Sequence, residues 1–303
     1  MDFRVKNRGA KSNLLSLYLE NHSTGKVHSK FKNGLNVLLG NSLIYIGCIG
    51  RPLSAFGLNI EEKKLNRLLD SARMGDIVVN KGERLFFYSV CETIIIDYKN
   101  AEQVDLRLPS IKCSSHGIKD TKLYNFLVGI EFERLIGIYL DELTSGYIDL
   151  LLNSNKSNLK VNTDIVRFFT GRGKGLTPGG DDILIGFTLA LKVFGKFDSW
   201  TTALEAGVTS DRTTMISLAY LSALLRGYAS EHFIQLVKLV DDGDMNAIEE
   251  TIKEVQSFGH TSGNDTLFGF FLGMKYLSNH TGVDEDTGRA EASEMYENPS
   301  SRR

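Results

Sequence analysis

The sequence predicts an α+β protein: a β-rich N-terminal part, a small barrel or curled sheet, followed by an all-helical C-terminal part. Two patterns predict this order. Up to about residue 100, the apolar residues form short or alternating runs separated by glycine-containing turns, as in strands. From about Asp120 they recur at helical spacing instead. A chain of 303 residues is long enough for two such parts.

The N-terminal strands are short apolar runs bounded by turn residues. Asn33-Gly34 lies between two of them and is a strong hairpin signal. Leu65, Leu68 and Leu69 have helical spacing, which predicts a helix inserted at Glu61–Ala72. The expected strands are Val27–Phe31, Leu35–Leu39, Leu43–Cys48, Ile77–Val79, Leu85–Ser89 and Thr93–Ile96.

The C-terminal part reads as a series of helices. They are expected at Leu123–Leu140, Ile165–Phe169, Asp182–Phe194, Arg212–Tyr228, Glu231–Val240, Met245–Gln256 and about Thr266–Leu277. We place a β-rich domain at 1–115 and a helical domain at 116–281, because Pro109, paired serines and Gly117 mark a break. Residues 282–303 are acidic and polar, and are expected to be a disordered tail.

Composition excludes several classes of function. With 35 basic and 37 acidic residues well mixed, the chain lacks the basic face of a nucleic-acid binder. Its most apolar run, Ile183–Leu191, is too short to span a membrane, and the N-terminus does not resemble a secretory signal. Cys48, Cys91 and Cys113 are far apart and are expected to be free core residues. A cytoplasmic location is therefore expected.

Two similar loops carry the polar residues of interest. Gly175-Leu-Thr-Pro-Gly-Gly-Asp-Asp precedes one apolar helix, and Gly259-His-Thr-Ser-Gly-Asn-Asp precedes another, 84 residues later. An ungapped alignment pairs four positions: Gly175 with Gly259, Thr177 with Thr261, Gly179 with Gly263, and Asp181 with Asp265. Each loop alone has an ordinary alternative as a capped helix start.

The repeated pattern predicts one shared pocket for a small anion. Glycines let the backbone approach a ligand, while threonine and aspartate oxygens are expected to cap the helices. The remaining N–H groups and the helix dipole would then attract negative charge. The expected binding residues are Lys174, Gly175, Thr177, Gly179, Gly180, Arg212, Thr213, Thr261, Ser262, Gly263 and Asp265.

Asp181, Asp182 and His260 are the candidate catalytic residues. One aspartate would cap its helix while the other faces the ligand, and His260 would donate to a substrate oxygen or shuttle a proton. No cofactor is expected, although Mg²⁺ held by Asp181, Asp182 and Asp265 is an alternative. His28, in the first expected strand, could reach the site from the other part of the chain.

Two further segments are ambiguous. In the cluster Thr209–Thr214, Ser210 or Asp211 would cap the next helix, while Arg212, Thr213 and Thr214 could face the pocket. The glycines at Gly186–Phe187 and Phe268–Gly273 are most simply explained by close helix packing.

At these two loops the chain resembles the AllH-like family, long catalogued as a domain of unknown function. Val27-His-Ser and Ser230-Glu231 add weaker support, and the similar order of motifs covers about residues 25–278. The family usually has Thr-Pro-Ser-Gly-Asp-Asp, and Gly179 replaces that serine here. If that hydroxyl contacts ligand, this chain has lost one donor.

The resemblance implies one subunit of an oxamate carbamoyltransferase of purine (allantoin) breakdown, which converts oxalurate and phosphate to oxamate and carbamoyl phosphate. It also implies protein partners: an acyl-CoA-synthetase-like subunit and a further subunit. Two hypotheses follow. Either this chain binds the small anionic substrate and takes part in catalysis, or it is a non-catalytic ligand-sensing or scaffolding subunit.

Overall fold

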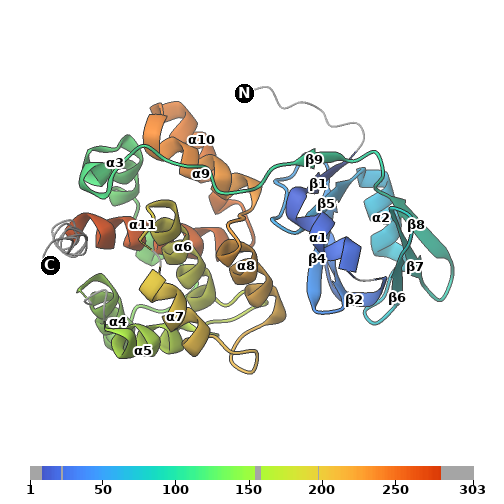
Figure 1. The fold of residues 1–303 in the computed structure, drawn as a ribbon, viewed down its shortest axis with the longest axis horizontal. Coiled ribbons are helices and arrows are strands. Elements are labelled where there is room, and N and C mark those ends of the chain that lie inside the picture. The colour runs from blue at the N-terminus through green and yellow to red at the C-terminus, as the bar shows by residue number, and fades with distance from the viewer. Residues whose placement is uncertain (1–8, 22, 154–157, 197, 281–303) are drawn as a thin grey trace, which may run out of the picture.

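The computed structural model describes residues 9–21, 23–153, 158–196 and 198–280, so the expected tail at 282–303 lies outside it. Figure 1 shows a β-sheet part beside a helical part, joined by one long connection. The predicted fold class is confirmed: a curled half-barrel sheet comes first and the helices follow.

The described part of the sheet has nine strands in the order β8-β7-β6-β2-β3-β4-β5-β1-β9. All six expected strands are present, and β2 and β3 form the predicted antiparallel hairpin. The three unexpected strands, β1, β5 and β9, are three or four residues long, too short to show a pattern. The strands are β1 (Ala10–Ser12), β2 (Thr24–Phe31), β3 (Gly34–Leu39), β4 (Ser42–Cys48), β5 (Gly57–Ile60), β6 (Ile77–Asn80), β7 (Arg84–Tyr88), β8 (Thr93–Asp97) and β9 (Glu102–Val104).

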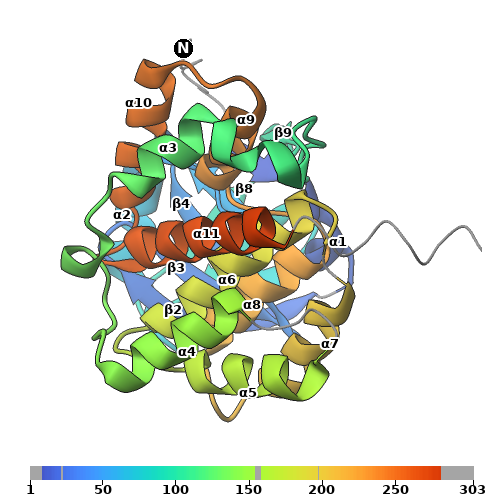
Figure 2. The same cartoon turned by 90° about the vertical axis from the view of Figure 1, so that its left-hand side faces the viewer.

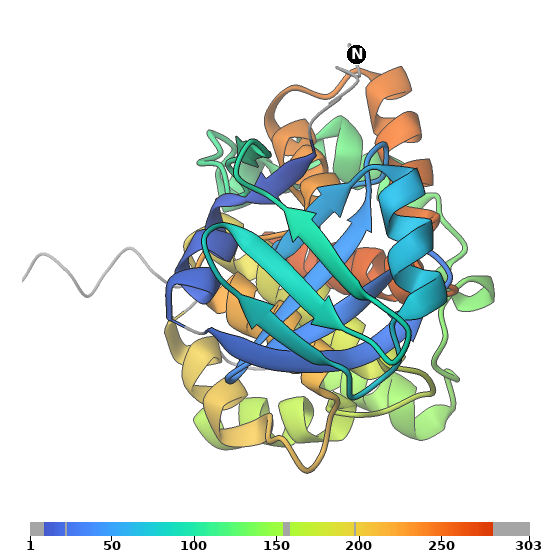
Figure 3. The ribbon, with the colours of Figure 1, turned by 90° about the vertical axis from the view of Figure 1, so that its right-hand side faces the viewer.

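The two faces of the sheet pack against different partners. Leu35, Val37 and Leu39 of β3 point to one face and form a core with helix α2 (Glu62–Ser71), visible beside the sheet in Figure 3. On the other face, Leu38 and Tyr45 pack with helix α8 (Met215–Leu225). The face of the sheet that carries Leu38 and Tyr45 therefore contacts the helical part directly.

Helices account for most of the described chain after residue 114. The expected helix does not continue through Leu135–Leu140; this segment is a loop, because the Gly137 amide binds the Asp265 side chain instead of a helical carbonyl. The helices not already given are α1 (Asn13–Asn21), α3 (Lys122–Val128), α4 (Glu142–Asn153), α5 (Leu159–Phe169), α6 (Gly179–Val193), α7 (Asp198–Gly207), α9 (Glu231–Asp242), α10 (Met245–Gln256) and α11 (Ser262–Asn279), with short 3₁₀ turns at Ser115–Asp120 and Phe132–Arg134.

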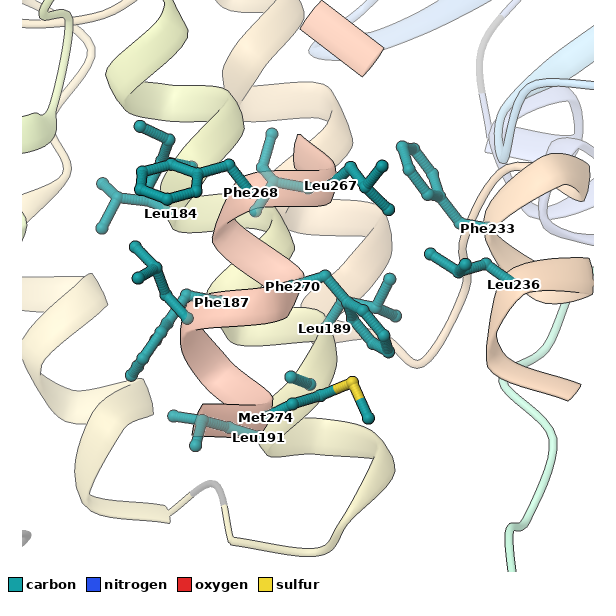
Figure 4. Close-up of a cluster of buried hydrophobic side chains, with 14 of the residues drawn as sticks. Leu184, Phe187, Leu189, Leu191, Phe233, Leu236, Leu267, Phe268, Phe270 and Met274 are labelled. Carbon is teal, nitrogen blue, oxygen red and sulfur yellow. The ribbon is translucent and has the colours of Figure 1, made fainter. Parts of the chain in front are cut away.

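Helices α6 and α11 cross at the centre of the helical part (Figure 2). Their backbones approach closely, because a Cβ at Gly186 would lie 1.9 Å from the Thr266 carbonyl oxygen, and one at Gly269 would lie 2.1 Å from that of Ile183. Figure 4 shows Leu184 and Phe187 of α6 beside Phe268 of α11 in the surrounding core. The expected packing role of these glycines is confirmed.

The two parts of the chain are joined by more than apolar contacts. The Glu231 carboxylate accepts from the Leu53 amide at 2.9 Å, and the Glu231 amide donates to the Leu53 carbonyl at 2.9 Å. The Ser230 hydroxyl accepts from the Ala55 amide at 3.3 Å. Two backbone bonds extend this joint: Leu108 N to Gly227 O at 2.8 Å, and Ala229 N to Leu106 O at 3.1 Å.

Two other findings bear on the sequence predictions. The three cysteines are free. Cys48 and Cys113 are partly buried and pack against the hydrophobic cores, but Cys91 is exposed, so its assignment to the core is wrong. Within the described ranges, no helix combines the length and apolar character needed to cross a bilayer.

Candidate functional site

The two similar loops meet at the crossing of α6 and α11. Helix α6 begins at Gly179 in the first loop, and α11 begins at Ser262 in the second. The Thr177 and Ser262 hydroxyl oxygens lie 2.7 Å apart, which is hydrogen-bonding distance. The loops are therefore direct neighbours at two adjacent helix N-termini.

The equivalent aspartates Asp181 and Asp265 have equivalent contacts. Asp181 Oδ1 accepts from the Gly171 amide, and Asp265 Oδ1 accepts from the Gly137 amide, each at 2.7 Å. Neither helix has a side-chain N-cap bond: Pro178 at the cap position of α6 has no polar side chain, and the Thr261 side chain at that of α11 does not cap. The expected capping role of these aspartates is wrong, since Asp181 binds the start of its own connection at Gly171 and Asp265 binds the loop at Gly137.

Burial raises the pKa of both carboxyls. Hydrogen bonds from Thr213 and Gly171 oppose this rise at Asp181, and those from Gly137 and Thr261 oppose it at Asp265. Both side chains are buried. Both oxygens of Asp181 are thus engaged with the protein, whereas Asp265 Oδ2 is buried without a partner among the described residues.

The glycines of the loops divide into packing and turn positions. The Gly180 amide donates to the Arg172 carbonyl at 2.8 Å, and the Gly263 amide donates to that of Phe258 at 3.0 Å, so neither amide is free for an anion. A Cβ at either glycine would lie within 2.1 Å of a carbonyl oxygen. Gly175 and Gly259 have φ values of +104° and +67°, the left-handed region that favours glycine.

Gly179 faces the second loop. A Cβ there would lie 2.9 Å from Ile138 Cγ2 and 3.1 Å from Asp265 Oδ1. Any larger residue, including the serine usual in the family, would therefore have to displace one of these neighbours.

Asp182 is the acidic residue without an equivalent in the second loop, where Thr266 takes its place. Its side chain is buried and its Oδ2 has no hydrogen-bond partner among the described residues. The pKa of Asp182 lies well above that of an ordinary aspartate, mainly because the side chain is buried. The charges of Asp265 and Asp181 raise this pKa further, and hydrogen bonds from Ser262 and Thr177 lower it. A raised pKa favours the protonated carboxyl, which can both donate and accept a hydrogen bond.

The segment before α8 joins the first loop. The Thr213 hydroxyl donates to Asp181 Oδ2, and the Thr214 hydroxyl donates to the Leu176 carbonyl at 2.6 Å. Thr214 also caps α8, accepting from the Ser217 amide at 3.1 Å, so the expectation of a cap at Ser210 or Asp211 is wrong.

A cavity of about 10 Å³ lies beside these contacts, which is room for about one water molecule. Asp181, Thr213 and Ser217 supply its polar lining.

The candidate cations and histidines lie at the margin. Lys174 and His260 are exposed, and neither side chain makes a hydrogen bond within the described ranges. Arg212 is exposed and donates to the Arg167 carbonyl at 3.0 Å. His28 lies on β2, where its Nδ1 is 3.2 Å from the Ser29 hydroxyl, and no hydrogen bond joins it to either loop.

The geometry gives no support to the Mg²⁺ alternative. Asp181, Asp182 and Asp265 do not form a joint ligand set: among the described residues, no group of three or more His, Cys, Asp or Glu side chains is arranged to hold a metal ion.

Tyr220 is a residue that the sequence did not single out. It lies on α8, with its ring centroid 6.4 Å from that of Phe258, just before the second loop. Burial raises the pKa of Tyr220, a Ser54 hydrogen bond opposes this, and the charges of Tyr45 and Asp182 raise it further. In sequence it is one apolar residue among many in a helix, so no signal marked it.

Comparison with known proteins places this geometry in context. Residues 169–274 match the AllH family. The family is described as oxamate carbamoyltransferase subunit AllH, and the matched segment contains both loops, the Thr209–Thr214 cluster and Tyr220. The resemblance to the AllH-like family is confirmed over this segment. No solved structure matches the chain.

Proposed function

We propose that this protein is a subunit of an oxamate carbamoyltransferase-type enzyme, and that its ligand site lies where the two loops meet, at Asp182. The supporting observation is that the segment matching AllH contains two buried aspartates, Asp182 and Asp265, each with an Oδ2 that has no partner among the described residues; of the two, only Asp182 has no backbone amide bound to its other oxygen. A buried polar atom without a partner is costly, and a bound ligand would supply the missing hydrogen bond.

The proposed reaction is the phosphorolysis of oxalurate. A phosphate oxygen attacks the carbamoyl carbon, the bond from that carbon to the oxamate nitrogen breaks, and carbamoyl phosphate and oxamate are released. The leaving nitrogen needs a proton, and phosphate in its monohydrogen form brings one. We assign Asp182 to carry that proton to the nitrogen, because its pKa lies well above the usual range.

Two exposed side chains at the edge of the site would orient the charged ends of the substrates. Lys174 is exposed directly before the first loop and offers a cation to phosphate or carboxylate. His260, exposed on the second loop, would donate to a substrate oxygen or exchange protons with solvent. Asp181 supports the loop and takes no direct part, since its two oxygens accept from Gly171 and Thr213.

The rival function is a non-catalytic ligand-sensing or scaffolding subunit. One observation favours it: the repeated aspartates and glycines of both loops serve internal contacts, which a scaffold also needs. In that case the unpartnered oxygen of Asp182 would have no part in turnover.

Reconstitution with the partner subunits separates the two. The assay is carbamoyl phosphate formation from oxalurate and phosphate, with assembly followed by size-exclusion chromatography. Asp182→Asn keeps the size and neutral charge of a protonated aspartate but cannot donate a carboxyl proton. It should lower turnover about 100-fold or more in an intact complex.

Asp70→Asn is the matched control, because Asp70 is exposed on α2, in the other part of the chain. It should leave turnover and assembly unchanged. Full turnover by Asp182→Asn in an intact complex would instead support the scaffolding function.

A further inference from the structure

Helix α4 carries an exposed apolar stripe in addition to the side that packs into the core. Leu143, Gly146, Tyr147 and Leu150 follow one another at helical spacing. Leu143 is 58% exposed and Leu150 is 49% exposed, whereas Leu151 is buried in the core. Figure 1 shows α4 on the side of the helical part that is turned away from the sheet. The helix is thus apolar on two sides, of which the sheet covers neither.

The stripe forms the floor of an open groove of about 690 Å³. The groove is lined by Asp141, Glu142, Leu143, Gly146, Tyr147 and Leu150. Tyr147 is fixed there because its ring stacks on that of Phe168, with the centroids 3.8 Å apart. An apolar groove that runs along a helix is a shape that receives an amphipathic helix from another protein.

Gly146 is a second observation that points to a partner. Glycine inside a helix is less stable than alanine, so it needs a structural reason. At Gly186, Gly269 and Gly273 the reason is a neighbouring helix, because a Cβ at each would lie within 2.5 Å of an atom of that helix. A Cβ at Gly146 would meet no other described element within 4 Å. Gly146 therefore resembles a helix-packing glycine whose packing helix is absent from the described residues.

The charges beside the groove are acidic. Asp141 and Glu142 line it, Asp149 is exposed on the same helix, and α4 contains no lysine or arginine. Arg172 pairs with Asp141 at 3.8 Å, whereas Glu142 and Asp149 have no ion pair within the described ranges. A second copy of α4 crossing at Gly146 in either direction would bring like charges together. The groove therefore suits a basic segment and disfavours a second copy of this chain.

We propose that this groove is the docking site for a partner subunit, which inserts a helix with apolar residues at helical spacing and lysine or arginine beside them. The inference rests on the proposed function only in that the chain is a subunit, and it is independent of the role of Asp182. Gly146 lets the two helix backbones approach, as Gly186 and Gly269 do within the helical part. The apolar side chains supply affinity, and the acidic residues select a basic partner.

The groove adjoins the two loops through the segment that precedes α4. The Gly137 amide binds Asp265 at 2.7 Å, and a Cβ at Gly179 would lie 2.9 Å from Ile138 Cγ2. The lining of the groove then begins at Asp141. A subunit docked in the groove is therefore held beside the start of both α6 and α11.

Gly146→Leu tests the docking site, with each partner subunit of the reconstituted enzyme as a separate probe and biolayer interferometry as the measurement. The new side chain fills the groove, so affinity for the docking subunit should fall at least about tenfold. The thermal midpoint should not fall, because a Cβ at this position meets no other described element and leucine favours helix. Asn66→Leu, which adds the same side chain at an exposed position of α2, should bind like the wild type.

Charge reversal tests the acidic border of the groove. Glu142→Lys should weaken the same association about two- to tenfold at low salt, and the loss should shrink at high salt. Glu62→Lys, at an exposed glutamate of α2, should have no effect at either salt concentration. A Glu142→Lys variant that binds as tightly as the wild type would contradict a basic partner.

The assembly measurements separate the docking site from the ligand site. Asp182→Asn should bind the partner subunits like the wild type, so loss of turnover and loss of assembly are distinct results. Partner binding that Gly146→Leu leaves within twofold would overturn the docking site and keep the ligand site. A wild type that binds neither subunit would overturn both proposals.

Two further results decide the remaining cases. Sedimentation of the wild type alone should show a monomer; a dimer that Gly146→Leu dissociates would mean that a second copy covers the groove, and would overturn the proposed partner. Should Gly146→Leu fail to fold, Leu143→Asn decides, because it removes an exposed apolar contact without adding bulk. It should weaken partner binding about tenfold, and an unchanged affinity would reject the docking site.

Discussion

The hydroxyl oxygens of Thr177 and Ser262 lie 2.7 Å apart, although 85 residues separate them in the chain. The contact exists because two similar loops begin two helices that cross closely, with Gly186 and Gly269 removing the side chains that would separate them. The arrangement brings Asp182, which the second loop does not duplicate, into a buried polar junction. The predictions below test the packing, the charges and the loop contacts on which this junction depends.

Gly186→Ala should destabilise the protein by about 1–3 kcal/mol or more, because the new methyl group would overlap the Thr266 carbonyl and force the helices apart. Gly146→Ala, in α4 with no atom within 4 Å of the new Cβ, is the matched control. It should be neutral or stabilising by up to about 1 kcal/mol, because alanine favours helix. Urea denaturation of both variants measures the difference, and equal effects would contradict the close crossing.

Asp182→Asn should become progressively more stable than the wild type as the pH rises above about 4. Burial raises the pKa of Asp182 in the folded protein, so between the unfolded and folded pKa values the folded state holds a proton that the unfolded state has lost. Rising pH therefore favours unfolding of the wild type in that window, and asparagine removes this contribution.

Asp141→Asn should change the pH dependence of stability in the opposite direction, and serves as the comparison in the same experiment. Hydrogen bonds from Thr144 lower the pKa of Asp141, so its carboxylate stabilises the fold above its unfolded pKa and loses this effect as the pH falls. Its replacement should therefore lower stability relative to the wild type as the pH rises toward neutrality. Thermal melts from pH 3 to 9 provide the comparison, and parallel curves for Asp182→Asn and the wild type would refute the raised pKa.

Asp265→Ala should cost about 1–3 kcal/mol, because it leaves the Gly137 amide without its acceptor. Asp265→Asn retains a carbonyl oxygen and should cost less. Hydrogen exchange at the Gly137 amide reports the contact directly and should accelerate in the alanine variant. Asp244→Ala removes the cap of α10 at a similar cost of about 1 kcal/mol but should leave Gly137 exchange unchanged.

Lys174→Gln should weaken binding of oxamate or phosphate about two- to fivefold at low salt, the effect expected of one exposed cation. The difference should shrink at high ionic strength because salt screens exposed charges. Lys63→Gln, at an exposed lysine of α2, should have no effect at either salt concentration. A loss of affinity that salt does not change would point to altered loop structure instead.

The sequence predicted the order of the two parts and most of their elements because local pattern determines them. Asn33-Gly34 has the backbone preferences of a hairpin turn, and leucines at helical spacing mark α2. Strands of three or four residues, such as β1 and β5, were missed because they carry no measurable periodicity and depend on neighbouring strands. The loop at Leu135–Leu140 was assigned to a helix because the bond from Gly137 to Asp265 is formed only in three dimensions.

The candidate site, like the fold, could be predicted only as far as local sequence patterns determine it. The repeat of Thr177 and Asp181 at Thr261 and Asp265 identified two loops that the structure brings into contact. The partners of their side chains could not be predicted, because Gly171 lies outside the repeat, at the start of the same connection, and Gly137 belongs to another loop, and no spacing rule links either to the repeat. Tyr220 was missed for the same reason: its ring contacts Phe56 and Phe258, neither of which is near it in sequence.

The joint made by Ser230 and Glu231 has a consequence for dissecting this chain. A fragment beginning at residue 116 would contain the whole segment that matches AllH, yet it would lose Leu53 and Ala55, whose amides bind these two side chains. It would also expose Ile216 and Ala223, which the sheet now covers. Such a truncated protein should aggregate and be poorly soluble. Loss of activity on deleting the sheet would therefore show that the sheet keeps the helical part folded, and would not show that the sheet takes part in the reaction.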